Sequence, residues 1–309
     1  MVVAVGTALS VLGLGALALV LCFTLVSQLT YARAQGIAYD DFRAALSRGM
    51  VPVGQTITEF PEVVAPAVGD TEAPETAEPV QRRVAPGTPI ALMSVPALGI
   101  DRTVLLEGTG GAVLQQGPGH QRNSAFPGQP GGANIYGRAW SFGGVFGGIG
   151  QLQRGDEIRF TTGQLQTDDG TFDPDAEIVY EVTTIRRAGD QIRIPDPSTP
   201  RLTLVTAEGE LFLPRGALYV DAELVGEPQP VAFRQATELP PGEALMAREA
   251  GAWVPVLLWS QGLLIAALAL TWLRIRWGRM QAWVVGTPVV AALAVGLTGS
   301  ASLLLPNLL

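Results

Sequence analysis

Few side chains in this 309-residue sequence could act as a nucleophile or carry a proton near neutral pH. There is one cysteine, Cys22, and one histidine, His120. A thiol beside an imidazole can perform covalent catalysis, because the imidazole accepts the thiol proton. One cysteine cannot form a disulfide within the chain or a cysteine-rich metal site, and one histidine cannot build a multi-histidine zinc centre. The sequence therefore predicts no metal ion and no other cofactor.

Cys22 is badly placed to meet His120. It falls within residues 1–32, which contain no charged side chain and are long enough to cross a bilayer. We expect an uncleaved membrane anchor here, with Cys22 as a small apolar residue inside it. A cleaved signal peptide is the alternative, because Ala32-Arg33-Ala34 resembles a cleavage site. However, the apolar run is longer than usual for a signal peptide and has no basic start.

Two other clusters could be interpreted as ligand sites. Carboxylates gather between Asp168 and Glu177, and their oxygens suit calcium. Their spacing does not match an EF-hand loop, so we favour an acidic hairpin turn. Glycines recur between Gly137 and Gly150, but this segment lacks the Lys-Ser/Thr of a phosphate-binding Walker motif. We expect a flexible loop there.

The composition excludes several classes of protein. Hydrophobic residues make up 48% of the chain and charged residues 16%, with a net charge of −8 and a mean hydropathy of +0.29. All the basic residues are arginine. The chain is too apolar to be intrinsically disordered, and its acidity argues against nucleic acid as a partner.

Two further apolar segments near the C-terminus predict transmembrane helices over residues 251–273 and 280–306. Arg274, Arg276 and Arg279 lie between them, and such short basic loops stay in the cytoplasm. Together with the anchor over 1–32, this gives three transmembrane helices with the N-terminus inside. We therefore expect a multi-pass protein of the cell membrane, with residues 33–250 on the extracytoplasmic side.

The outer region divides by composition. Residues 33–49 predict a juxtamembrane helix, residues 50–88 a proline-rich acidic linker, and residues 227–250 a second linker. Between the linkers, residues 89–226 carry short runs rich in Val, Ile, Thr and Tyr, which argue for a β-barrel or sandwich. These runs are 90–95, 103–107, 133–137, 157–161, 177–185, 201–206 and 217–225.

This β-domain resembles the sortases of Gram-positive bacteria, especially actinobacterial ones. The matching pieces are Val95-Pro-Ala-Leu-Gly-Ile100, Glu107-Gly-Thr109, Gly117-Pro-Gly-His120, Pro127-Gly-Gln-Pro-Gly131, Leu152-Gln-Arg-Gly-Asp-Glu-Ile158 and Arg201-Leu-Thr-Leu-Val-Thr-Ala-Glu-Gly209. The resemblance implies an eight-stranded barrel in the cell envelope. It also implies transpeptidation of a sorting-signal peptide by a cysteine thiolate, with a histidine as acid and base and an arginine that stabilises the tetrahedral intermediate.

The catalytic positions implied by the resemblance are substituted in this chain. Arg138 stands where the family has its histidine, in Gly137-Arg138, and Ala207 stands where it has its cysteine. Ala217 falls at the position of the family arginine. Arg215, two residues earlier, keeps the strand parity and could still face the groove. A methyl group is no nucleophile, and a guanidinium is no base near neutral pH.

Two residues near these positions are candidates for the groove wall. His120 lies in a loop leading towards the groove, and we expect it to make a structural hydrogen bond. Thr206 precedes Ala207 and could be proposed as a nucleophile, but threonine is common in strands because of its high β-propensity. We thus expect the groove to include His120, Arg138, Thr206, Ala207 and Arg215.

Three functions remain open at this point. The favoured hypothesis is an inactive, membrane-anchored sortase-fold protein whose groove binds an extended peptide or a membrane or cell-envelope partner. The second is an active, cysteine-independent transpeptidase or hydrolase, since fold does not dictate function. The third is a structural subunit of a membrane assembly, in which the small residues of 280–306 pack against other helices.

Overall fold

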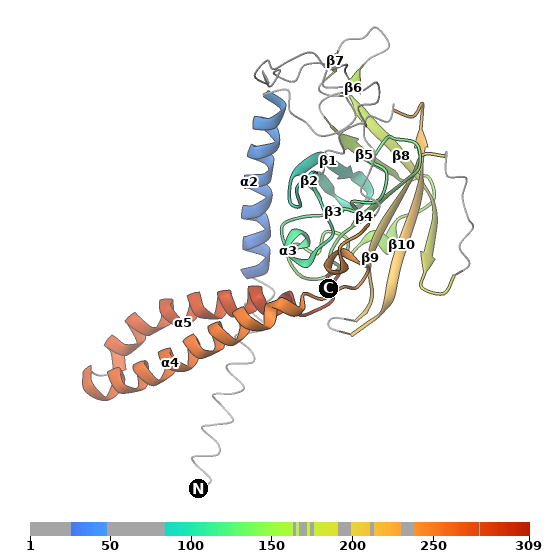
Figure 1. Cartoon of the computed structure of the whole chain (residues 1–309). Helices are drawn as coiled ribbons and strands as arrows, with labels where there is room; N and C mark the ends of the chain where they lie inside the picture. The colour runs from blue at the N-terminus through green and yellow to red at the C-terminus, as the bar shows by residue number, and fades with distance from the viewer. Residues whose placement is uncertain are drawn as a thin grey trace, which may run out of the picture.

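The computed structural model describes residues 26–47, 84–162, 165–166, 172–173, 176–190, 199–210, 213–229, 238–277 and 279–309. Cys22 and almost all of the expected 1–32 anchor and 50–88 linker lie outside the described residues. Figure 1 shows a β-barrel with one long helix along its side and a helical hairpin extending from its base.

The barrel is closed by eight strands in the order β1-β2-β3-β4-β9-β10-β8-β5. These strands are β1 (Pro89–Val95), β2 (Ile100–Glu107), β3 (Gly119–His120), β4 (Gly132–Tyr136), β5 (Glu157–Thr161), β8 (Glu177–Arg187), β9 (Arg201–Glu210) and β10 (Leu213–Val225). Most neighbours are antiparallel, but β4 runs parallel to β9 and β2 runs parallel to β3. The mainly β fold and the eight-stranded barrel implied by the resemblance are confirmed.

The barrel interior is apolar because alternate residues of each strand point inward. Leu202 and Leu204 of β9 lie in this core, for example, whereas Thr203 between them is only half-buried. The seven runs seen in the sequence correspond to seven of the strands. The eighth, β3, has two residues, which is too short to produce an alternating pattern.

Helix α2 (Ser27–Ser47) packs along β1 and β2. Ala38 and Phe42, one turn apart, face the barrel and are buried. Gln35 fixes the contact through two backbone groups: its Oε1 accepts a hydrogen bond from the Val104 N–H at 2.8 Å, and its Nε2 donates to the Gln116 carbonyl at 2.8 Å. The helix therefore covers the region where the sequence predicts a juxtamembrane helix and starts six residues earlier.

The helical hairpin consists of α4 (Trp253–Trp277) and α5 (Arg279–Ser302). Within the described residues, two segments are long and apolar enough to cross a membrane, Ala250–Leu270 and Val284–Ser302. The first expected span lies mostly outside the described residues, so a third helix stays a prediction. Glycines let the hairpin helices approach closely: a Cβ at Gly286 would overlap Leu270, and one at Gly296 would overlap the Trp259 ring.

Helix α5 ends four residues before the expected boundary at residue 306. Pro306 has no N–H to donate, and residues 303–309 instead bond to groups at the base of the barrel. The C-terminal residue lies beside α3 (Gly111–Leu114) and β9 (Figure 1).

The acidic stretch is described only in part. Short strands β6 (Leu165–Gln166) and β7 (Phe172–Asp173) pair with each other beside the barrel. Residues 167–171 and 174–175 lie outside the described residues, so calcium binding by this stretch stays open.

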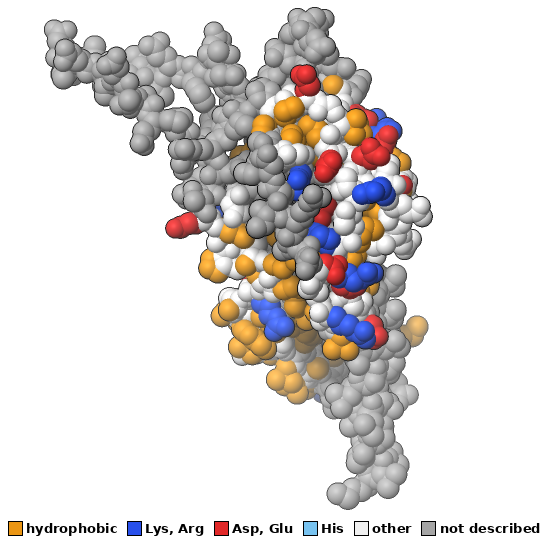
Figure 2. Space-filling model, turned by 90° about the vertical axis from the view of Figure 1, so that its right-hand side faces the viewer, with side chains coloured by type: hydrophobic (Ala, Val, Ile, Leu, Met, Phe, Trp, Pro, Cys, Tyr) orange, Lys and Arg blue, Asp and Glu red, His pale blue; other side chains and the backbone are white. Residues whose placement is uncertain are grey.

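The outer face of the barrel carries charges of both signs. Red and blue side chains lie next to one another in Figure 2. Exposed ion pairs include Arg159–Glu157 at 2.6 Å and Arg187–Glu208 at 2.6 Å. Pairs of this kind contribute little to stability.

Candidate functional site

Residues 138 and 207, which the resemblance matches to the family's catalytic positions, lie at the ends of β4 and β9. The Gly137 N–H donates to the Val205 carbonyl at 3.0 Å, which continues the β4–β9 pairing one residue beyond the strand. Arg138 follows directly. Gly137 is required because a Cβ there would overlap the Phe146 ring. On the other side of β9, Ala207 pairs with Ala217 of β10.

Ala207 lies on the outer face of the barrel and is 4% exposed. It belongs to an apolar cluster that we call the groove cluster, comprising Leu114, Tyr136, Ala139, Val205, Ala207, Ala217, Leu308 and Leu309. Three of these residues are alanines from three different segments, so small side chains lie against Leu308 and Leu309 in this cluster. The alanine methyl groups provide packing surface and no nucleophile.

Arg138 is 1% exposed. Its guanidinium donates to Ser141 Oγ at 3.0 Å, to the Leu309 main-chain oxygen at 2.9 Å and to the Gly111 carbonyl at 3.1 Å. It also lies over the Phe142 ring, 5.1 Å from the centroid. Burial lowers the pKa of Arg138 to about 10, with a smaller opposing effect from Glu249. The group is still cationic at neutral pH and cannot serve as a base.

The end of the chain fills the groove cluster. Leu308 is fully buried and Leu309 nearly so. The Leu308 carbonyl accepts a hydrogen bond from the Ala139 N–H at 2.9 Å. The Leu309 main-chain oxygen accepts from Arg138 and from the Ser141 hydroxyl. A main chain held by such contacts, with its side chains in apolar pockets, resembles a bound peptide.

His120 faces away from this groove. It pairs with Ile135 of β4, whose side chain lies in the barrel interior, and its ring stacks on Phe126 at 4.7 Å. His120 Nδ1 lies 2.8 Å from Glu107 Oε2, and Nε2 lies 2.8 Å from the Ala125 carbonyl. The imidazole is thus a fully buried structural group.

Glu107, His120 and Ser124 have the order of a hydrolase triad, since Ser124 Oγ is 3.2 Å from His120 Nε2. The hydrogen bonds argue against that role. A carbonyl oxygen can only accept, so the Ala125 oxygen requires a proton on Nε2. A protonated Nε2 cannot take a proton from Ser124, and that hydroxyl already donates to the Gln121 carbonyl at 2.7 Å. All three side chains are buried, so substrate has no access to them.

The remaining expected groove residues also lie elsewhere. Thr206 points to the other face of β9 from Ala207, and its hydroxyl donates to the Gly137 carbonyl at 2.8 Å. The side chain of Arg215 is 79% exposed and lies 3.6 Å from Glu210. A bulge between Pro214 and Gly216 explains this, because an extra residue in β10 breaks the parity on which the expectation for Arg215 rested.

The structure therefore brings together Arg138 and Ala207, and it separates them from His120, Thr206 and Arg215. Sequence reasoning missed Ser141, Gly111 and the end of the chain. Leu309 is 171 positions from Arg138 along the chain, and no local pattern connects the two. The small residues at 139, 207 and 217 are the sequence feature that leaves room for larger side chains in the groove cluster.

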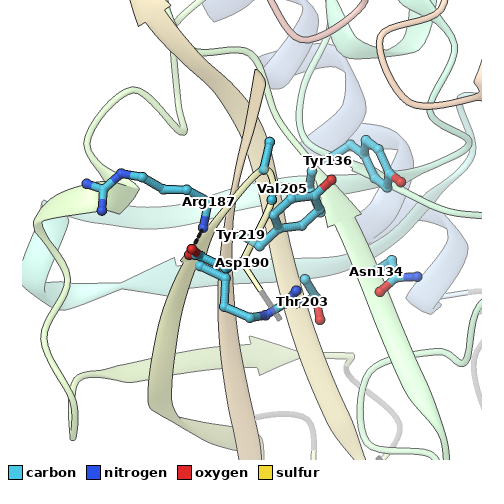
Figure 3. A pocket seen from close by; sticks show the side chains of 10 residues that line it. Asn134, Tyr136, Arg187, Asp190, Thr203, Val205 and Tyr219 are labelled. Atoms are coloured by element: carbon cyan, nitrogen blue, oxygen red, sulfur yellow. Dashed lines mark hydrogen bonds between the residues drawn. The ribbon is translucent and has the colours of Figure 1, made fainter. Parts of the chain in front are cut away.

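An open pocket of about 520 Å³ adjoins the groove cluster and shares Tyr136 and Val205 with it. Figure 3 shows its wall, with Asn134 and Tyr136 from β4, Thr203 and Val205 from β9, and Tyr219 from β10.

Polar contacts order the far side of this pocket. Arg186 Nη2 donates to Asp221 Oδ1 at 2.7 Å, and the guanidinium lies over the Tyr219 ring. Asp221, through its hydrogen bond and charge, raises the pKa of Arg186. Burial, assisted by Tyr219, raises the pKa of Tyr136 to about 12, so the phenol is neutral at physiological pH. The groove thus has a filled apolar end and an open polar end.

Comparisons with known proteins agree with this fold. A family model described as the sortase domain matches residues 93–225. No curated protein sequence matches. Sortase E from Streptomyces avermitilis is 30% identical, with 47% of this chain and 93% of that chain covered and a TM-score of 0.37. A sortase D5 transpeptidase of Clostridium perfringens is 29% identical, with 46% of this chain and 82% of that chain covered and a TM-score of 0.37. Sortase A from Corynebacterium diphtheriae is 27% identical, with 45% of this chain and 61% of that chain covered and a TM-score of 0.36.

The family model covers seven of the eight barrel strands completely and the end of β1, from Met93 to Val95. The closed barrel and the matched segments of sequence coincide over this range. The β-barrel of this chain is a domain of the sortase family.

Proposed function

We propose that this protein is a catalytically inactive sortase-fold protein, anchored in the membrane, whose groove binds an extended peptide of a membrane or cell-envelope partner on the extracytoplasmic side. The observation that carries the proposal is the pair Arg138 and Ala207. They occupy the family positions of the acid–base histidine and the nucleophilic cysteine.

The chemistry of transpeptidation needs both of the missing groups. The thiolate forms the acyl-enzyme, and the imidazole protonates the leaving amine. Ala207 can form no covalent bond to a carbonyl carbon. Arg138 holds its proton at neutral pH, and its two terminal nitrogens donate to Ser141, Leu309 and Gly111. The Glu107–His120–Ser124 group cannot replace them, because it is buried and because His120 Nε2 carries a proton and so cannot accept one from Ser124.

Binding without cleavage is supported by the way the groove holds residues 308 and 309. The Ala139 N–H and the Arg138 guanidinium bind main-chain oxygens, and the groove cluster takes two leucine side chains. Main-chain contacts of this type accept many sequences, and the pockets select the side chains.

The proposed membrane location rests on α4 and α5, whose apolar surfaces are largely exposed. Burying these surfaces in lipid removes them from water. The Arg274–Arg279 segment then lies in the cytoplasm and the barrel on the opposite side.

The proposal is tested with full-length protein in detergent micelles and a sorting-signal peptide that carries a fluorophore and a quencher. We expect no cleavage and no transfer to an added amine. Ala207→Cys alone should not restore turnover, because Arg138 cannot take or return a proton. The double variant Ala207→Cys/Arg138→His supplies both groups and is the matched positive control. Cleavage by the unmodified protein that resists thiol reagents would favour an active, cysteine-independent enzyme instead.

A further inference from the structure

The segment that fills the groove starts at the end of α5. We call residues Leu303–Leu309 the tail. The Leu303 carbonyl accepts a hydrogen bond from the Glu249 N–H at 3.0 Å, which ties the start of the tail to the residues that precede α4. Gln115 Nε2 of the barrel donates to Ser302 Oγ at 2.7 Å. The tail therefore leaves α5 directly at the mouth of the groove.

Asn307 holds the middle of the tail. Its side-chain Nδ2 donates to the Thr109 carbonyl at 2.8 Å and to the Ala244 carbonyl at 3.1 Å. Its backbone N–H donates to the Ala247 carbonyl at 2.9 Å. Each partner lies in a loop near α3 or before α4, so Asn307 joins the hairpin base to the barrel.

Leu308 and Leu309 then cover the two substituted catalytic positions. Their side chains belong to the groove cluster with Ala207 and Ala217, and Arg138 binds the Leu309 main-chain oxygen. A peptide that reached residues 138 and 207 would have to lie on this surface. The tail already occupies it.

The fit between tail and groove is incomplete in its polar contacts. Arg138 Nε and Asn307 Oδ1 are buried and have no hydrogen-bond partner among the described residues. An unpaired buried polar group weakens a contact, because it has lost water and gained nothing. A ligand that supplied an acceptor to Arg138 Nε would satisfy an atom that the tail leaves unpaired.

We propose that the tail is an intramolecular ligand that keeps the groove closed, and that a partner peptide enters by displacing it. This inference rests on the proposed peptide-binding function and specifies its ligand. The partner presents an extended peptide with two adjacent large aliphatic residues, which take the places of Leu308 and Leu309. The rest of the peptide lies in the open pocket along Asn134, Thr203 and Tyr219.

The open pocket makes displacement possible without unfolding. It shares Tyr136 and Val205 with the groove cluster, so a peptide can bind the open end first and then compete for the filled end. The free energy of docking the tail sets the apparent affinity for the partner peptide, because that affinity is proportional to the fraction of protein in which the groove is open.

The test uses the peptide Leu-Leu-Leu-Pro-Asn-Leu-Leu, the sequence of the tail, labelled at its N-terminus. Its binding to full-length protein in micelles is followed by fluorescence anisotropy. Leu308→Asp, which places a charge at a fully buried position, should open the groove and lower the Kd at least about tenfold. The matched control is Leu213→Asp, the same change at a position that is 68% exposed, and it should bind as the wild type does.

A milder variant guards against misfolding of Leu308→Asp. Asn307→Ala removes two side-chain hydrogen bonds and keeps the leucines, and it should also tighten binding. A probe peptide with aspartate in place of its sixth residue is the control for partition into the micelles. Its anisotropy should not rise with any variant. Equal binding of the probe by wild type, Leu308→Asp and Asn307→Ala would overturn the displacement model and leave a peptide-binding groove standing. Absence of binding in all three would overturn both.

Discussion

Replacing Arg138 should destabilise the protein, although the change removes a buried charge. Arg138→Met keeps an unbranched side chain over Phe142 and deletes the donors to Ser141, Gly111 and Leu309. Hydrogen bonds from charged groups contribute about 1.5–3 kcal/mol each, which gives roughly 4.5–9 kcal/mol for three. The lowering of the Arg138 pKa to about 10 corresponds to a cost of about 3 kcal/mol for burying the charge.

The difference is a loss of about 2–6 kcal/mol in the free energy of unfolding. For a domain of this size that lowers Tm by roughly 4–24 °C. The measurement is thermal unfolding of full-length protein in micelles, followed by the circular dichroism of the β-barrel. Arg138→Lys should fall between wild type and Arg138→Met, because one ammonium cannot reach three separate oxygens.

Arg187→Met is the control for loss of a cation, since the side chain of Arg187 is 64% exposed and pairs with Glu208 at the surface. Its Tm should stay within experimental error of the wild type. A structural role for the buried guanidinium is refuted if Arg138→Met unfolds at the wild-type temperature, or if Arg187→Met loses as much stability as Arg138→Met.

Three further outcomes are expected. Glu107→Gln breaks the buried pair with His120 and should lower the free energy of unfolding in urea by about 3–5 kcal/mol; a change below about 1 kcal/mol would contradict a structural role. Burial raises the pKa of Tyr180 to about 12, so its contribution is present below pH 10 and is lost as pH rises from 10 to 12, by about 1.4 kcal/mol per pH unit. Tyr180→Phe should flatten that part of the pH profile, and an unchanged slope would refute the assignment. Finally, Gly278→Cys in a Cys22→Ala background should resist impermeant maleimide applied to intact cells, because the proposed topology places the arginine-rich loop in the cytoplasm; labelling from outside would contradict that topology.

The barrel could be anticipated from the sequence because most of its strands follow local rules. Long strands such as β8 and β9 alternate apolar and polar residues, and Gly or Pro separates them. Strand β3 was not predicted, because two residues are too few to show an alternating pattern. Its existence depends on Leu106 and Tyr136 being brought to either side of it by the rest of the barrel.

The site could be anticipated only where the resemblance supplied a position. Arg138 and Ala207 are adjacent because β4 and β9 pair in parallel, and the matching segments placed them on these strands. Arg215 was misplaced by a bulge, which changes the facing of a side chain without leaving a periodic signal. His120 was misplaced because its two-residue strand turns it inward towards Phe126.

The occupied groove could not be foreseen at all. Residues 303–309 continue an apolar run that has the composition of a transmembrane helix. What removes them from the helix is a set of partners in distant loops, such as the Thr109 and Ala244 carbonyls, which lie 198 and 63 positions from Asn307. Only the folded barrel brings these groups to the end of α5.

The central claim, that the groove binds peptide without chemistry, is tested most directly by the product yield from wild-type protein. Full-length protein and a sorting-signal peptide are incubated with an amine acceptor, and cleaved and transferred products are counted by mass spectrometry against peptide alone. An inactive groove predicts the same yield in both samples at every protein concentration. Product that rises with the amount of protein, and persists in a Cys22→Ser variant, would contradict it.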